Sequence, residues 1–224
     1  MKSITIALSL ILSTTLIMAQ GTQSNQKSME PKTNYTAIFG TLGLPTGDFA
    51  KVTGDNFGKA KTGFGIGILH VNEISPIVSF VIEGRFNYNS LDVSAMEEKI
   101  NDSGISIDES GYKTFWGLGG FQINSVLKRG GRLYAKGLGG FVLGLTPRIE
   151  LRDGGKSDVA FKVATAISFG FGIGCGYTIQ DKILIEATYL SGKPEYTIKS
   201  EIENETYKTK MEHSIFSINL GFIF

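Results

Sequence analysis

The chain has 224 residues, with 22 Lys and Arg against 21 Asp and Glu, so its formal net charge is only +1. This length suits one domain. Because the positive and negative charges are nearly equal in number, they give no electrostatic basis for binding nucleic acid. Cys175 is the single cysteine, which excludes an intrachain disulfide.

The first 20 residues have the pattern of an export signal. Lys2 supplies a positive charge, and an uncharged stretch from Ile4 to Met18 precedes a plausible cleavage edge at Ala19 or Gln20. The apolar stretch is about 15 residues long, shorter than the roughly 20 that a helical membrane span needs. We therefore predict a signal peptide over 1–20, a short polar leader over 21–33 and one domain over 34–224.

From Asn34 onward the chain repeats one plan, in which apolar and polar residues alternate. Eight segments of this kind are predicted as strands, at 34–43, 61–72, 76–90, 111–126, 131–147, 160–178, 182–197 and 207–224. The connections after the odd-numbered segments are long and polar, at 44–60, 91–110, 148–159 and 198–206, whereas the others are tight. Long loops at one end and short turns at the other predict an all-β fold, an eight-stranded antiparallel up-and-down transmembrane β-barrel.

The alternation also predicts which side chains face the interior. Four charged residues share the parity of the inner face: Glu83, Arg85, Lys136 and Glu186. They could form a polar pathway through the barrel or a salt-bridge network that fills it. We favour the network, because eight strands enclose a space only just wide enough for side chains and buried charges must be paired.

Two segments do not keep one apolar parity. In 111–126 and 131–147 the bulky residues fall at both odd and even positions: Trp116, Leu118, Phe121, Leu138, Phe141 and Val142. Either bulges interrupt these strands or the interior is largely apolar there, and the sequence leaves both explanations open. In 160–178, by contrast, bulky residues alternate with glycine, which leaves room for large side chains from the opposite wall.

The last segment has the most regular alternation. One face carries Phe216, Ile218, Leu220, Phe222 and Phe224, and the other includes Ser217 and Asn219. An apolar alternation that ends in a C-terminal Phe resembles the sorting pattern of bacterial outer-membrane proteins, which their barrel-assembly machinery recognises. The resemblance makes outer-membrane lipid and this machinery the expected partners.

A heptad directly after the first segment carries a second resemblance. It consists of Gly43, Leu44, Pro45, Thr46, Gly47, Asp48 and Phe49. It is similar to the first-loop motif of the outer-membrane β-barrel domain family of small porin-like proteins, related in architecture to OmpA and OmpX. Because Pro45 fixes φ and Gly47 permits φ > 0, the heptad suits a tight turn at the strand end. The resemblance implies a closed barrel in the outer membrane of a Gram-negative bacterium, with both termini periplasmic, and does not imply one activity.

Catalysis finds little support in the residues. The only histidines are His70 and His213, and adjacent strand residues such as His213 and Ser214 point to opposite faces, so they do not suit a base and nucleophile even beside Glu212. We expect no enzymatic activity, no metal and no cofactor. The predicted function is a monomeric outer-membrane barrel without a large pore, which has a structural role or binds an extracellular ligand or surface through its long loops. The alternatives are a narrow conduit for small or hydrophobic solutes and, less favoured, a lipid-modifying enzyme.

Overall fold

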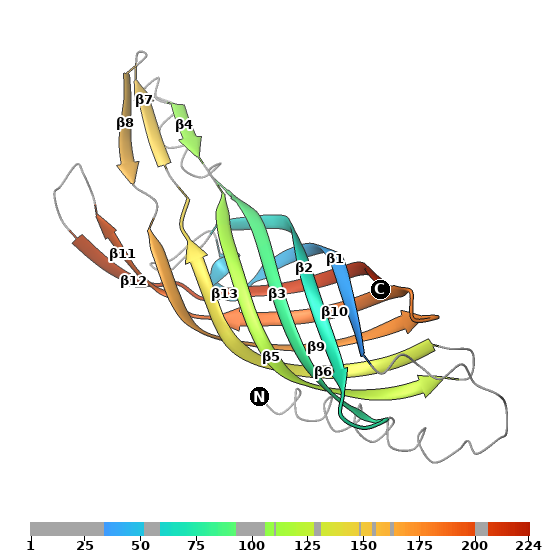
Figure 1. Cartoon of the computed structure of the whole chain (residues 1–224). Coiled ribbons are helices and arrows are strands. Elements are labelled where there is room, and N and C mark those ends of the chain that lie inside the picture. The colour runs from blue at the N-terminus through green and yellow to red at the C-terminus, as the bar shows by residue number, and fades with distance from the viewer. Residues whose placement is uncertain are drawn as a thin grey trace, which may run out of the picture.

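Eight long strands close into one antiparallel barrel (Figure 1). They are β1 (Asn34–Thr46), β2 (Ala60–Glu73), β3 (Val78–Leu91), β5 (Tyr112–Leu127), β6 (Gly131–Leu145), β9 (Thr165–Ile179), β10 (Ile183–Gly192) and β13 (His213–Ile223). The first and last barrel strands pair from Thr46↔Ser214 to Ala37↔Ile223, which closes the wall. The predicted fold class is therefore confirmed.

The computed structural model describes residues 34–51, 59–92, 106–109, 111–127, 131–147, 149–153, 156–161, 164–199 and 206–224. The predicted signal peptide over 1–20 and leader over 21–33 lie outside these residues. Within them, no helix is long and apolar enough to span a membrane.

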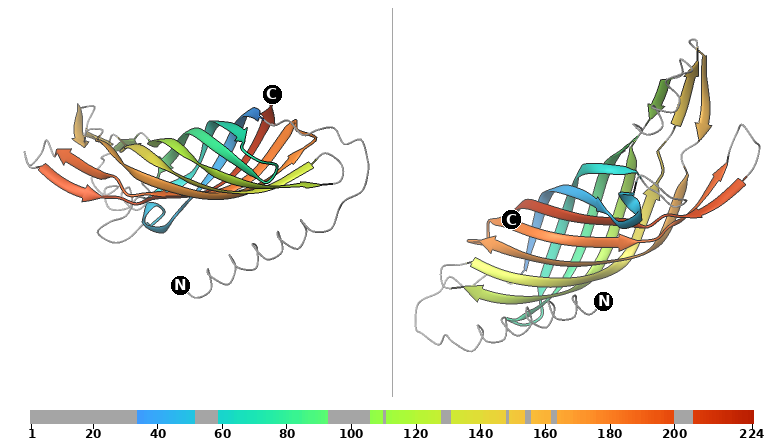
Figure 2. Two further views of the ribbon diagram at one scale, coloured as in Figure 1. Left: turned by 60° about the horizontal axis from the view of Figure 1, so that its bottom comes forward. Right: turned by 180° about the vertical axis from the view of Figure 1, so that it is seen from behind.

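Two small sheets extend beyond the barrel at the end where the long loops lie (Figures 1 and 2). One contains β4 (Ser106–Glu109), β7 (Ile149–Asp153) and β8 (Lys156–Phe161), and the other pairs β11 (Glu195–Lys199) with β12 (Thr206–Lys210). The segments predicted as single strands at 182–197 and 207–224 are therefore each divided into a barrel strand and an outer strand. The first division falls at Lys193 and Pro194, where proline cannot continue the ladder.

The opposite end of the barrel has short turns. Between β9 and β10, Gln180 and Asp181 both have φ of 51°, and the Lys182 N–H donates to the Ile179 carbonyl oxygen at 3.0 Å. Positive φ at both central residues is the geometry of a type I′ turn, which matches the twist of the flanking strands. Because Ile179 pairs with Ile183, only three residues lie between the two paired strand ends.

The inner faces of β5 and β6 carry bulky apolar side chains beside polar ones such as Gln122 and Lys136, which explains the mixed parity that the sequence left open. Trp116, Leu118 and Val142 are buried inside, whereas Phe121 and Phe141 face outward. The pairing of β5 with β6 runs in one register from Lys113↔Leu145 to Leu127↔Gly131, so no bulge is needed to explain the mixed parity. On β9 the inward glycines make room for these rings: a Cβ at Gly170 would lie 2.9 Å from the Trp116 ring.

Candidate functional site

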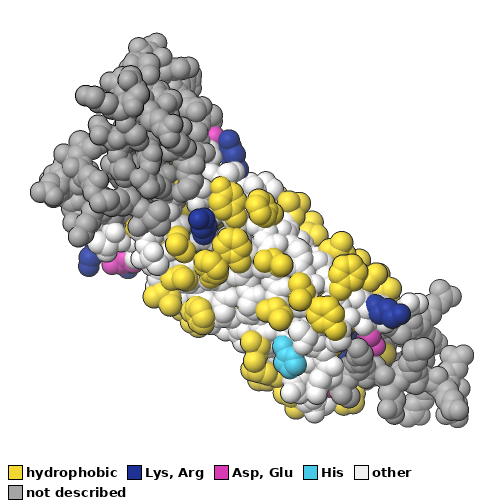
Figure 3. All heavy atoms as spheres, turned by 45° about the horizontal axis from the view of Figure 1, so that its top comes forward, with side chains coloured by type: hydrophobic (Ala, Val, Ile, Leu, Met, Phe, Trp, Pro, Cys, Tyr) yellow, Lys and Arg dark blue, Asp and Glu magenta, His cyan; other side chains and the backbone are white. Residues whose placement is uncertain are grey.

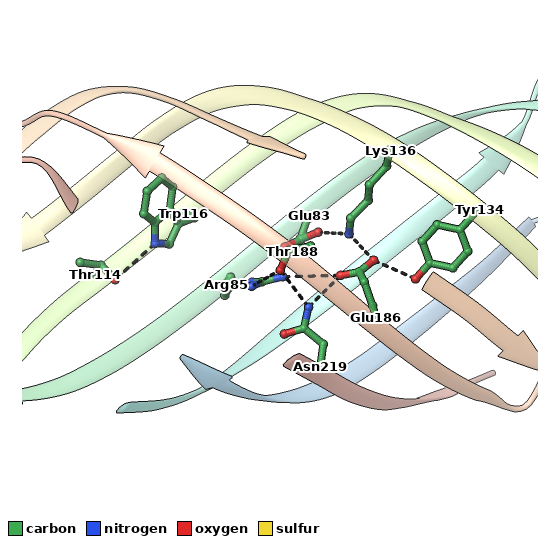
Figure 4. Close-up of polar contacts among 9 residues, drawn as sticks. All are labelled: Glu83, Arg85, Thr114, Trp116, Tyr134, Lys136, Glu186, Thr188 and Asn219. Carbon is green, nitrogen blue, oxygen red and sulfur yellow. Dashed lines mark hydrogen bonds and ion pairs between the residues drawn. The ribbon is translucent and has the colours of Figure 1, made fainter. Parts of the chain in front are cut away.

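The four predicted inner charges meet in the middle of the lumen (Figure 4). Lys136 Nζ lies 2.5 Å from Glu83 Oε2 and 2.6 Å from Glu186 Oε2. Arg85 Nη2 lies 2.6 Å from Glu83 Oε1 and 3.7 Å from Glu186 Oε1. All four side chains are fully buried. We call Glu83, Arg85, Lys136 and Glu186 the lumen charge network; its two cations balance its two carboxylates.

Neutral side chains from β6, β10 and β13 complete this network. The Tyr134 hydroxyl donates to Glu186 Oε2 and the Asn219 amide donates to Glu186 Oε1, both at 2.8 Å. Arg85 Nη1 donates to Thr188 Oγ1 at 3.0 Å. Tyr134 was not singled out from the sequence, although its even number on the same segment as Lys136 places both on one face.

Packed apolar and aromatic side chains surround the network within the barrel. The Arg85 guanidinium stacks over the Phe39 ring at 5.0 Å, and Phe39, Leu69, Leu118 and other inward residues form one buried cluster. Since charged hydrogen bonds cross the lumen and apolar side chains fill it, the geometry favours a structural filling over an open polar pathway.

Apolar side chains cover much of the barrel wall on the face that Figure 3 shows. Large apolar side chains are exposed on every barrel strand; they include Ile38, Leu42, Phe64, Ile66, Phe80, Ile82, Phe115, Phe121, Leu133, Phe141, Phe169, Phe171, Ile185, Ile218 and Phe222. A soluble protein does not present so continuous an apolar surface, whereas a barrel whose backbone hydrogen bonds close on themselves does so in lipid. The chain has the fold of an outer-membrane β-barrel.

No protein-family profile and no curated protein matches the sequence. Among solved structures, the chain is similar to Ail, the attachment invasion locus protein of Yersinia pestis, at 15% identity and a TM-score of 0.49, covering 85% of this chain and 97% of that one. It is similar to Neisserial surface protein A at 13% identity and a TM-score of 0.40, covering 86% and 95%. It is also similar to the N-terminal β-barrel domain of Pseudomonas aeruginosa OprF at 10% identity and a TM-score of 0.38, covering 87% and 100%.

The predicted sorting strand forms part of this outer-membrane barrel wall. Phe216, Ile218, Leu220, Phe222 and Phe224 are all exposed on the outside of β13, and Ser217 and Asn219 are buried inside. The Phe224 N–H donates to the Thr36 carbonyl oxygen at 2.9 Å, so the last residue is held against β1. Recognition of this strand by an assembly machinery stays a prediction.

The first-loop heptad was predicted to follow the first strand, but its first four residues continue β1 as far as Thr46 in pairing with β13, and only its last three form a turn at the long-loop mouth of the barrel. Gly47 has φ of 59° and begins a 3-10 turn, η1 (Gly47–Phe49), which directs the Phe49 ring inward. Phe49 is fully buried, with its ring centroid 5.1 Å from that of Tyr112 and 4.5 Å from that of His213. Beside the turn, Asp48 pairs with Lys51, and this hydrogen bond lowers the pKa of the Asp48 carboxyl.

A second long loop reaches the same place. Tyr196, from the outer strand β11, is buried and its hydroxyl lies 2.6 Å from His213 Nε2. We call Phe49, Tyr112, Tyr196 and His213 the mouth cluster. The sequence did not predict it, because the four residues come from separate segments and period-two alternation carries no information about contacts between loops.

The hydrogen-bond partners of the two histidines differ from those of Ser214, the serine considered as a nucleophile. Ser214 Oγ donates to Glu212 Oε1 at 2.5 Å and lies 3.0 Å from Ser191 Oγ, whereas His213 bonds to Tyr196. His70 is exposed on the outside, with Nδ1 3.0 Å from Thr36 Oγ1. In the part of the chain that the structure describes, no group of three or more His, Cys, Asp or Glu residues is placed to hold a metal ion. Cys175 is exposed on the outside of β9.

Proposed function

We propose that this outer-membrane barrel is a monomeric, non-enzymatic scaffold that presents its long loops at the cell surface. The observation that carries the proposal is the filled lumen combined with strands that continue beyond the barrel. The packed side chains of the lumen make the barrel a rigid support. The projecting sheets β4–β7–β8 and β11–β12 provide a surface that a partner can contact.

Packed side chains fill the lumen at two levels along the barrel axis, which argues against a large pore. The lumen charge network joins β3, β6 and β10 in the middle, and the mouth cluster covers the end where the long loops lie. Opening a path would require separating buried ion pairs, which is strongly unfavourable in a low-dielectric interior.

The outer sheets support the surface role because binding residues are often carried by loops on a rigid scaffold. On the β11–β12 hairpin, Lys210 Nζ pairs with Glu195 Oε2 at 3.3 Å, and both side chains are largely exposed. The outer edges of such small sheets also offer unpaired backbone groups to an extended segment of a partner.

The proposed orientation follows from the threading of the chain. Short periplasmic turns and long extracellular loops are the rule for these barrels. We therefore place β4, β7, β8, β11 and β12 outside the cell and both termini in the periplasm, in the outer membrane of a Gram-negative bacterium. The last strand then meets the barrel-assembly machinery from the periplasmic side.

Two measurements on the refolded full chain test the proposal. In planar bilayers we expect no stable conductance steps, whereas reproducible steps would support the narrow conduit and contradict the scaffold. In cells, replacing 195–210 or 149–161 by a two-residue turn should leave the heat-modifiable gel mobility of the barrel intact and reduce attachment to the surface or partner that the intact protein binds. Unchanged attachment after both replacements would contradict a role for the loops.

A further inference from the structure

The strand pairing of the barrel wall is incomplete at one place, the long-loop end of the seam between β1 and β2. The pairing of these strands ends at Gly43↔Gly63, although on its other edge β1 stays paired with β13 as far as Thr46↔Ser214. The last three residues of β1 thus diverge from β2 while they remain attached to the wall on one side.

A bulge in β2 widens the same place. Its register against β3 shifts between Ala60↔Leu91 and Gly63↔Asn89, so two consecutive side chains, Lys61 and Thr62, are both exposed. The Asn89 amide donates to the Lys61 carbonyl oxygen at 2.9 Å, which holds the bulge in place.

The result is a cleft of about 590 Å³, which we call the rim notch. It is lined by Leu44, Pro45, Ala60, Lys61, Thr62 and Ser90. The ammonium of Lys61 and the hydroxyls of Thr62 and Ser90 are hydrogen-bond donors, whereas Leu44 and Pro45 form an apolar side.

The notch continues into the apolar outer surface. Leu42 and Phe64 are paired across the seam directly below its closed end, and they are 50% and 65% exposed toward the lipid. A cation and two hydroxyls therefore lie at the border of the apolar band, one step along the strands from side chains that suit a hydrocarbon chain.

We propose that the rim notch binds one anionic lipid, with its headgroup phosphate at Lys61, Thr62 and Ser90 and an acyl chain over Leu42 and Phe64. The site faces the surrounding lipid and is separate from the lumen and from the outer sheets, so it goes beyond the proposed scaffold role and does not depend on which way the barrel is oriented.

Asp92 affects how strongly the rim notch holds a phosphate. Lys61 Nζ lies 3.3 Å from Asp92 Oδ1, so this carboxylate positions the ammonium and also competes with a phosphate for it. Removing the Asp92 charge should consequently strengthen phosphate binding, the opposite of the effect of removing Lys61.

Native mass spectrometry of the refolded full chain in a neutral detergent tests the proposal, with dioleoylphosphatidylglycerol as the probe and dioleoylphosphatidylcholine as the uncharged reference. One phosphatidylglycerol should bind in preference to phosphatidylcholine. Lys61→Gln should weaken it about fivefold, since a charge-assisted hydrogen bond at an exposed site is lost. Asp92→Asn should tighten it about two- to threefold by removing the competing carboxylate.

Two further variants separate the notch from general surface charge. Thr62→Phe keeps Lys61 but fills the cleft. It should also weaken lipid binding about fivefold, because the headgroup can no longer enter the cleft. Lys113→Gln removes an exposed lysine at the same end of the wall, on β5, and should leave binding unchanged. Equal losses for Lys113→Gln and Lys61→Gln, or unchanged binding in both notch variants, would overturn the proposal. Displacement of the lipid by inorganic phosphate at equal concentration would overturn it too, because the acyl chain would then contribute nothing.

Discussion

Removing Lys136 from the lumen charge network should destabilise the barrel strongly, and a second substitution should recover much of the loss. Lys136→Met keeps the length of the side chain but removes the cation that lies 2.5 and 2.6 Å from the two carboxylates. Arg85 alone then faces Glu83 and Glu186, so the buried interior carries one uncompensated negative charge. Breaking a buried pair in this way costs about 3–5 kcal/mol of unfolding free energy.

Adding Glu186→Gln to Lys136→Met restores neutrality. The remaining Glu83 and Arg85 pair at 2.6 Å, and the glutamine amide keeps polar groups beside Tyr134 and Asn219. We expect the double variant to be about 2 kcal/mol more stable than Lys136→Met alone, within the range of coupling between residues of one network.

Tryptophan fluorescence during urea unfolding in lipid vesicles measures both values. Trp116 is the only tryptophan, and it is 2% exposed inside the barrel, where its Nε1 donates to Thr114 Oγ1 at 3.3 Å. Its emission therefore reports the loss of the packed lumen. A cost for Lys136→Met below about 0.5 kcal/mol, or a double variant as unstable as the sum of the single ones, would refute the idea of a coupled neutral network.

Further substitutions test three other parts of the barrel. Phe49→Ala empties the centre of the mouth cluster and should lower the unfolding free energy by about 3 kcal/mol in the same urea assay. Gly140→Ala places a Cβ against a backbone carbonyl oxygen of β5 and should cost roughly 2 kcal/mol, whereas Gly137→Ala, which meets open space on the lipid side, should be neutral or stabilising by about 0.5 kcal/mol. Lys51→Gln should raise the pKa of the Asp48 carboxyl toward its ordinary value of 3.8, as followed by NMR titration; the depressed pKa means that any stabilisation from Asp48 is present above that value and is lost as the pH falls.

The facing of the strands could be predicted from the sequence because a strand places alternate side chains on opposite faces. This is why Glu83 and Arg85 were expected inside, and why Phe222 was expected outside. The mixed parity at Trp116 and Phe121 was ambiguous for a physical reason: an apolar lumen and an apolar lipid face look alike in a hydropathy pattern.

The position of each inner side chain along the barrel axis could not be predicted in the same way. Lys136 and Glu83 lie on strands separated by β5, so their contact depends on two successive registers, Glu83↔Leu118 and Gln122↔Lys136. The alternation of either strand stays the same after a slip of two residues, although such a slip would move the ammonium away from both carboxylates. The same limit concealed the mouth cluster and the rim notch, which depend on where pairing stops.

The charge network consequently has a second physical role, in specifying the register of the barrel. Its members come from strands that do not all pair with one another, so the contacts across the lumen hold together wall segments that ladder hydrogen bonds alone would not align. A slip of one residue would turn Lys136 or Arg85 toward lipid, where a cation at the midplane costs about 2–4 kcal/mol, and it would leave the opposing carboxylates buried and unpaired. A slip of two residues would keep the cation inside but separate it from its partners. Both errors are therefore penalised, and this penalty gives a structural reason for charges inside the barrel that requires no conduction.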